Sequence, residues 1–293
     1  MKFLHSETYG WKSAFHGLRN PLESWAKSDS EFGISNIYGE ENTEVLYAWL
    51  EKIFPTYNPF DSEQDEPNDY QTELNKTNEW LWENGIINND SKNEGVTYAF
   101  IGPVDMNLAQ RMIAAGSPND KFLRQIFVSV DITAPEYWWN QFDTYKVGTV
   151  ANSTSKMHKL ASTPITRDCF EMDDYATLKV FDKEPYAIDD TTEECWDGII
   201  EICETLRKRY NETKDIKYWK ELIRILPESW LQTRTVTMNY SNLRNIVYWR
   251  KNHRLKYEWD SFIKWCQSLP YAEDLIFYHN GYDNGYELHN LLS

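Results

Sequence analysis

One stretch of this 293-residue chain, Leu222–Trp259, restricts its fold more than any other. At 3.6 residues per turn, Asn239, Leu243, Ile246 and Arg250 fall on one face of a helix, at positions i, i+4, i+7 and i+11. That face is apolar in its middle and polar at both ends, and a buried polar group without a partner is costly. The stripe therefore predicts a helix that packs into a core through its middle and offers Asn239 and Arg250 to a site.

The same stretch is basic within an acidic chain. It carries seven Lys and Arg residues against two acids, whereas the whole chain has 30 Lys and Arg, 46 Asp and Glu, and a formal net charge of −16. A local positive patch can hold a small anion at short range in spite of such a net charge. Nucleic-acid binding depends on neutralising many phosphates, so we expect no nucleic-acid partner.

The composition is that of a globular protein, with 41% hydrophobic residues and an unusual wealth of aromatic rings, among them 13 Trp and 19 Tyr. No apolar run approaches the length of a membrane span, and the start MKFLHSETYG lacks the apolar core of a signal peptide, so we expect no membrane partner. The four cysteines form no CxxC pair, which favours reduced thiols in a cytoplasmic protein. The six histidines are scattered, so we expect no protein-ligated metal.

The N-terminal third is expected to begin with a strand at Lys2–Leu4 and a helix at Ser6–Leu18. An acidic insertion follows at about 29–95. It contains an amphipathic helix at Val45–Phe54 and a charged loop at Asp61–Asp69. Apart from this insertion, we expect the whole chain to form one domain.

The middle of the chain shows a helix and then a strand. Asp105 is placed to cap a helix at Met106–Ala115, which Gly116 would close. Arg124–Ile132 alternates apolar and polar residues with a period of two, as in a half-buried strand.

The remainder is expected to be mainly helical. Residues 160–190 contain prolines and acids and predict a loop or lid. Helices are predicted at Glu193–Asn211 and Lys217–Ile225, and a closing helix at Trp259–Leu269.

Seven residues of the basic stretch follow a fixed spacing: Pro227, Thr233, Asn239, Leu243, Asn245, Arg250 and Glu258. They resemble the C-terminal signature of flavin-dependent thymidylate synthases. That signature has a Leu-Pro, a Thr, Asn-x-Arg-x-Leu-x-His/Asn, an Arg five residues on and a Glu eight beyond it. In the family the Asn and the later His/Asn contact the flavin, and the closing Arg contacts the nucleotide. Ser241 stands where the family has the Arg after the first Asn.

A second stretch, Trp138–Lys159, stands where the family has Arg-His-Arg-x-x-Ser-x-Asn-Glu-x-Ser-x-Arg. Its register has two solutions. Matching Asn152 and Ser155 to the family's Asn and Ser puts Tyr145–Val147 at the basic triplet, whereas the other alignment puts Thr144–Lys146 there. In both registers, the three arginines of the family's motif are replaced by one or two lysines. Lys cannot make the bidentate contacts that Arg makes to phosphate.

The resemblance implies an α+β fold with a mostly antiparallel sheet flanked by helices, assembled as a homotetramer. It implies reductive methylation of dUMP, or a related pyrimidine nucleotide, with FAD, NADPH and methylenetetrahydrofolate. The residues it singles out are Arg250 and Ser155 as catalytic, Asn239, Asn245, Lys146 and Arg124 as flavin contacts, and Arg224, Asn152, Lys156 and Arg250 as nucleotide contacts.

Three functions remain open at this point. The first is an active, divergent enzyme of this kind. The second is a non-catalytic descendant that binds a nucleotide as a sensor or sponge. The third is an interaction protein whose basic helix meets an acidic partner. The C-terminal signature favours the first two, and the reduced arginine triplet weakens the first.

Overall fold

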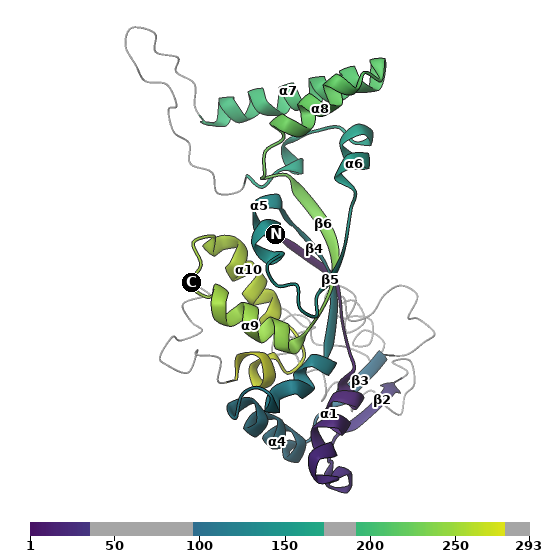
Figure 1. Cartoon of the computed structure of the whole chain (residues 1–293), viewed down its shortest axis with the longest axis vertical. Coiled ribbons are helices and arrows are strands. Elements are labelled where there is room, and N and C mark those ends of the chain that lie inside the picture. Colours follow the sequence, from purple (N-terminus) through teal and green to yellow (C-terminus); the bar gives the residue numbers. More distant parts are fainter. Residues whose placement is uncertain (36–95, 173–191, 279–293) are drawn as a thin grey trace, which may run out of the picture. The chain divides into compact units, whose positions relative to one another are not determined.

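The computed structural model of the protein describes residues 1–35, 96–172 and 192–278 (Figure 1). Its backbone contacts divide the chain into two compact units. Unit 1 consists of Met1–Ile132, Tyr145–Ala151 and Thr235–Ser293, and unit 2 of Thr133–Thr144 and Asn152–Arg234. The predicted helix Val45–Phe54 and the acidic loop Asp61–Asp69 lie outside the described residues. The expectation of one domain stays a prediction.

A four-stranded sheet is the framework of the fold. Its strands have the order β1-β4-β6-β5 and comprise β1 (Lys2–Tyr9), β4 (Phe127–Pro135), β6 (Leu231–Asn239) and β5 (Val150–Ser153). The hydroxyl pairs Ser129–Thr237 and Thr133–Thr233 join β4 to β6 with residue numbers that run in opposite directions, as in an antiparallel pair. With the helices around it, this sheet confirms the predicted α+β class.

Strand β4 confirms the predicted alternation but not the predicted start. Its inward side chains, together with the one that precedes the strand, are fully buried: Ile126, Val128, Val130 and Ile132. The strand begins at Phe127 and not at Arg124, because Asn119–Gln125 form a 3-10 helix, η4. Phe122 and Leu123 are adjacent and both buried, which breaks the alternation of a half-buried strand and fits a helical turn.

The N-terminal boundary was also predicted wrongly. Residues 6–9 continue β1, and the first helix, α1, spans Trp11–Arg19. The cause is pairing with β4, which the local sequence does not show. At the end of β1 the ring of Tyr9 stacks on Phe127, with 5.5 Å between ring centroids.

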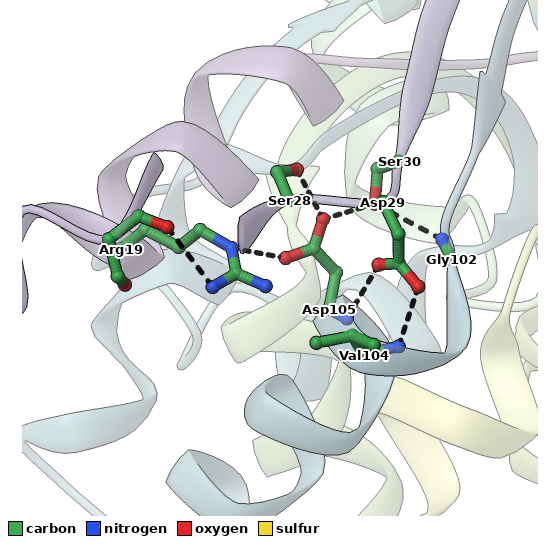
Figure 2. A network of polar contacts seen from close by, with 8 residues as sticks. Arg19, Ser28, Asp29, Ser30, Gly102, Val104 and Asp105 are labelled. Carbon is green, nitrogen blue, oxygen red and sulfur yellow. Dashed lines mark hydrogen bonds and ion pairs between the residues drawn. The ribbon is translucent and has the colours of Figure 1, made fainter. Parts of the chain in front are cut away.

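Helix α4 (Pro103–Ala114) has Gly102 as its N-cap residue, so Asp105 is not its cap. The cap comes from Asp29, whose carboxylate accepts the N–H groups of Val104 at 2.8 Å and of Asp105 at 3.0 Å (Figure 2). A Cβ on Gly102 would collide with Asp29, so the close approach requires glycine there. The predicted glycine at the other end is confirmed, because Gly116 follows the helix with a φ of 71°.

Asp105 is instead the centre of a buried network (Figure 2). One carboxylate oxygen accepts from Nε of Arg19 at 2.5 Å, and the other accepts from the hydroxyls of Ser28 and Ser30, each at 2.5 Å. Burial opposes the charge of Asp105, but these hydrogen bonds and the Arg19 cation outweigh it and hold its pKa below the ordinary value. Nη2 of Arg19 has no partner among the described residues.

Unit 1 is completed by helices that pack on one another and by a small hairpin. Helices α9 (Tyr240–Arg250) and α10 (Lys256–Gln267) contact each other, and a π-helix, Ala272–Phe277, packs against both (Figure 1). Strands β2 (Glu31–Ser35) and β3 (Val96–Phe100) form a separate antiparallel pair. The first residues of the expected insertion thus carry β2 and the Asp29 cap. The middle of the predicted stripe on α9 is confirmed by its full burial.

Unit 2 has its own apolar core. Helices α7 (Thr192–Thr213) and α8 (Ile216–Ile225) confirm two predictions and pack together. Helices α5 (Glu136–Phe142) and α6 (Lys156–Ser162) also belong to unit 2. The core consists of Leu160, Ile165, Phe170, Cys203, Trp219, Leu222, Leu226 and Trp230. Three of these belong to the segment expected as a loop or lid, whose residues 173–190 lie outside the described ones.

All four cysteines are free thiols. No helix in the described part of the chain combines the length and the apolar character that crossing a bilayer requires.

Candidate functional site

A cavity of about 720 Å³ opens in unit 1. Its wall includes Arg124, Phe127, Gly148, Asn239, Asn245 and Tyr248. These residues come from η4, the start of β4, the loop before β5, and α9 with its N-cap, which lie far apart in the sequence. The volume falls within the range of roughly 300–1,000 Å³ that small-molecule sites occupy.

The first turn of α9 is fixed by a reciprocal pair of asparagines. Asn239 is the N-cap, and its side-chain oxygen accepts the N–H of Asn242 at 3.0 Å, while Oδ1 of Asn242 accepts the N–H of Asn239 at 3.3 Å. Nδ2 of Asn242 donates to the carbonyl of Val147 at 2.5 Å. The cap therefore holds the loop before β5 against the helix.

Gly148 allows this loop to approach so closely. Its φ of 73° lies in the left-handed region, and a Cβ there would stand 2.9 Å from Nδ2 of Asn239 and 3.1 Å from Oδ1 of Asn242. Any other residue would strain the backbone and push the loop off the helix. Gly148 thus shapes the wall of the cavity at the point where Asn239 meets it.

Two arginines line the cavity, and they are in different situations. Nη1 of Arg244 donates to three carbonyl oxygens at the end of the π-helix, those of Leu275 at 2.8 Å, Ile276 at 2.9 Å and Tyr278 at 2.7 Å. Arg124 is exposed and has no carboxylate partner among the described residues. Arg124 is therefore the guanidinium of this cavity that can bind an incoming anion.

Arg250 lies between two aromatic rings. Its guanidinium carbon is 5.2 Å from the ring centroid of Tyr145 and 4.9 Å from that of Trp259, as in cation–π contacts. Its Nε is buried without a partner among the described residues. Burial raises the pKa of Tyr145, and the Arg250 cation opposes that rise without cancelling it.

The four predicted residues of unit 2 have local roles. Ser155 caps α6 by accepting the N–H of His158 at 3.4 Å, and Asn152 is exposed on β5. Nζ of Lys156 donates to Glu136 at 2.7 Å. Arg224 is exposed and bonds Glu221, one turn earlier on α8, at 3.1 Å. Exposed pairs of this last kind contribute little to stability, so Arg224 remains open to another anion.

The structure brings together three of the nine residues that the sequence singled out. Arg124, Asn239 and Asn245 line the cavity. Lys146 and Arg250 are also in unit 1 but are not part of its wall, and Lys146 is exposed. Those in unit 2 have the local roles just described.

Asp120 and Gly148 are among the cavity residues that sequence reasoning missed. Asp120 lines the cavity and carries a carboxylate oxygen that is buried without a partner among the described residues. Gly148 was missed as well, although a glycine directly after Tyr145–Val147, the place of the family's basic triplet, was a usable signal. Within the described ranges, no three His, Cys, Asp or Glu residues gather in a way that could hold a metal ion.

No protein-family model matches the chain, and no curated protein sequence matches it either. Solved structures do. A flavin-dependent thymidylate synthase ThyX from Helicobacter pylori, complexed with FAD and dUMP, is 12% identical over 94% of this chain and 98% of its own, with a TM-score of 0.52. A second structure of that enzyme, at 2.31 Å resolution, is 11% identical over 96% and 99%, also with a TM-score of 0.52.

A UMP/dUMP methylase, PolB from Streptomyces cacaoi, bound with 5-Br UMP, is 12% identical over 61% of this chain and 84% of its own. Its TM-score of 0.42 is too low to bear on the fold. The match to the two ThyX structures covers nearly the whole chain and shows that the protein has the fold of flavin-dependent thymidylate synthases.

Proposed function

We propose that the protein is a divergent flavin-dependent thymidylate synthase-like enzyme that methylates dUMP or a related pyrimidine nucleotide. The observation that carries this proposal is the meeting of Arg124, Asn239 and Asn245 at one cavity, in a chain with this fold. The sequence alone predicts these three residues as flavin contacts. The four free thiols of the protein agree with the expected cytoplasmic location.

The side chains of the cavity suit a flavin nucleotide. Such a cofactor combines a flat ring with an anionic phosphate arm. Phe127 and Tyr248 offer aromatic surface for the ring, and Asn245 offers an exposed amide for its polar edge. Arg124, which has no carboxylate partner among the described residues, offers a cation for the phosphate. The amide oxygen of Asn239 is occupied by the helix cap, so Asn239 shapes the site and Asn245 is its free amide.

Arg124 also accounts for an exchange of charge. Ser241, which stands at the family's Arg, lines the same cavity as Arg124. The cation lost from the first turn of α9 is thus replaced by one on η4. We expect Arg124, on η4, to bind the cofactor phosphate in place of the Arg that the family has at the position of Ser241.

In such an enzyme the bound flavin, reduced by NADPH, supplies the hydride, and methylenetetrahydrofolate supplies the carbon. The protein's part is to hold and orient the reactants. We assign Arg250, kept in place by the two rings beside it, to the nucleotide. Asn152, Lys156 and Arg224 stay proposed nucleotide contacts, Ser155 and Arg250 stay proposed catalytic residues, and Lys146 stays a proposed flavin contact.

The test is a titration with FAD followed by an activity assay. We expect quenching of flavin fluorescence with a dissociation constant in the micromolar range, and NADPH oxidation that depends on both FAD and dUMP. Arg124→Met should weaken FAD binding by about tenfold to a hundredfold, because a charge-assisted contact contributes roughly 1.5–3 kcal/mol. Saturating FAD that gives neither quenching nor turnover would end the enzyme proposal.

A non-catalytic nucleotide-binding descendant is the second candidate, and one observation favours it. At the place of the family's basic triplet, the Tyr145 ring packs on Arg250, Lys146 is exposed and the Val147 side chain is 87% exposed. This loop offers one cation where the family offers three basic groups. Calorimetry that shows dUMP binding without any flavin binding would select this candidate.

A homotetramer is part of the same proposal, since the resemblance implies a flavin site shared between chains. Light scattering should then give a mass near four times 34.8 kDa. A strict monomer would contradict the shared site.

A further inference from the structure

A second cavity of unit 1, with a volume of about 420 Å³, shares the helix η4 with the first cavity but none of its lining residues. Its wall comes from α1, from the short 3-10 helix η1 (Asn20–Leu22), from α4 and from η4 with the residue before it. Both α1 and α4 pack against η4. We call it the α1–η4 cavity. Its volume falls within the range of roughly 300–1,000 Å³ that small-molecule sites occupy, so a small organic molecule fits it.

Apolar side chains make up half of the described lining of this cavity: Leu18, Pro21, Met112, Pro118 and Phe122. Leu18 and Phe122 are buried and therefore held by the fold. Pro21 and Pro118 are exposed and Met112 is half-buried, so an occupant can reach all three. A methionine thioether makes favourable contacts with aromatic rings. This part of the wall therefore suits a flat aromatic ring.

The polar part of the lining is one cation among amides. Lys121 is the only charged residue of the described lining, and its exposed side chain has no carboxylate partner among the described residues. The exposed amides are those of Asn20, Asn119 and Gln125. The oxygen of the Asn20 amide accepts the indole N–H of Trp25 at 2.9 Å, which leaves its NH₂ group as a donor. One compact cation with neutral donors suits a carboxylate, whereas phosphate recognition favours the planar fork of Arg.

Gly17 brings α1 close to η4 at this wall. A Cβ on Gly17 would stand 2.8 Å from Oε1 of Gln125, and both residues line the cavity. The Gln125 amide thus lies directly against α1, where the glycine leaves room for it.

We propose that the α1–η4 cavity is a binding site for a small aromatic carboxylate, with the carboxylate at Lys121 and the ring at Met112 and the two prolines. The amides of the wall donate to the second carboxylate oxygen. This site goes beyond the proposed function, because none of the residues assigned to the flavin or the nucleotide lines this cavity.

The ligand-side test uses the wild-type protein with 2-naphthoate and with its neutral amide, 2-naphthamide, which has nearly the same shape. Calorimetry should give naphthoate a dissociation constant below about 1 mM. The amide should bind about tenfold more weakly, because only the acid makes a charge-assisted contact. Equal affinities for the two compounds, or binding of neither, would overturn the proposal.

Methyl NMR locates the ligand. In protein labelled at its methionine methyl groups, naphthoate should shift the resonance of Met112, because the ring of the ligand lies beside it. Met157 is the matched control, since it is an exposed methionine of α6 outside this cavity, and its resonance should stay in place. Met112→Leu assigns the signal. Binding that leaves the Met112 resonance unshifted would place the ligand elsewhere and refute the proposed site.

The protein-side test compares two lysines. Lys121→Met should weaken naphthoate binding about tenfold and leave naphthamide binding unchanged. Lys12→Met removes an exposed lysine of α1 that does not line the cavity, and it should change neither affinity. Equal losses in the two variants would refute a specific contact at Lys121. Since the ligand series needs no variant, it decides the proposal even if Lys121→Met does not fold.

Discussion

Two aspartates of unit 1 use the same chemical group in opposite ways. Both carboxylate oxygens of Asp105 have partners, in Arg19, Ser28 and Ser30 (Figure 2). Oδ1 of Asp120 is buried with no partner among the described residues. Both oxygens of the first carboxylate are bonded within the fold, whereas the second carboxylate has one buried oxygen without a partner among the described residues. The difference shows, by following each buried polar atom to its partner, that two carboxylates of one unit contribute to the fold to different degrees.

The contrast also separates what the two aspartates do for stability. The partners of Asp105 tie α1, residues 28–30 and α4 together, so its network holds segments that are distant in sequence. Asp120 has no such network among the described residues, and the burial of its Oδ1 without a partner is unfavourable. Changes at Asp105 should therefore lower stability more than changes at Asp120.

The largest effect is expected from Arg19→Met. This change leaves Asp105 buried without its cation, and breaking a buried ion pair from one side costs about 3–5 kcal/mol. Urea denaturation should show that loss in the free energy of unfolding. The exposed arginine of the cavity offers the control, since Arg124→Met should change stability by less than about 0.5 kcal/mol. Equal losses of stability in the two variants would show that Arg19 contributes no more to the fold than the exposed Arg124 does.

Arg250→Ala should have an intermediate effect, because Arg250 serves both purposes. Two cation–π contacts, each of about 0.5–1 kcal/mol, are lost, so we expect a fall of about 1–2 kcal/mol in the free energy of unfolding. Calorimetry on the folded variant should also show dUMP binding weakened by about tenfold to a hundredfold. Exposed Arg254 is the neighbouring control, and Arg254→Ala should change neither quantity. Unchanged dUMP affinity in Arg250→Ala would leave Arg250 a packing residue alone.

The smallest effect is a dependence on pH. The pKa of Asp105 is lower in the folded protein than in the unfolded chain, so its charge stabilises the fold fully above the ordinary value of 3.8. That contribution is lost as the pH falls through the lowered pKa. The difference in stability between wild type and Asp105→Asn should therefore be largest at neutral pH and shrink below about pH 4. A difference that stays constant from pH 7 to pH 3 would show that the charge of Asp105 is not what the network uses.

Periodic patterns made most of the fold predictable. Alternation gave the buried face of β4, and the 3.6-residue stripe gave α9, because local side-chain spacing alone decides which face is apolar. Prediction failed where the local structure depends on a segment that is distant in the sequence. Asp105 looks like a helix cap in its local sequence. The Asp29 side chain caps the helix instead, and Asp105 is buried in an ion pair with Arg19. Likewise, β1 extends to Tyr9 because it pairs with β4.

The site was predictable to the extent that a fixed spacing marked it. Asn239 and Asn245 were found through the spacing of the C-terminal signature, and both line the cavity. Arg124 was found as a polar group beside an expected strand. Asp120 lies only four residues before it, but nothing in the turn SPNDKFLRQ tells which side chains face a cavity. That depends on the 3-10 geometry of η4, which the sequence did not predict.

The pairing of β2 with β3 has a consequence for how this protein can change over evolutionary time. Ser35 and Val96 are partners in register, so their Cα atoms are about 4.5–5.5 Å apart. A turn of about two residues can join antiparallel strands at that separation. Each doubling in the length of a connecting segment costs only about 0.6 kcal/mol of closure entropy. The register of β2 and β3, and the Asp29 cap just before β2, therefore impose no particular length during evolution on the chain that joins the two strands.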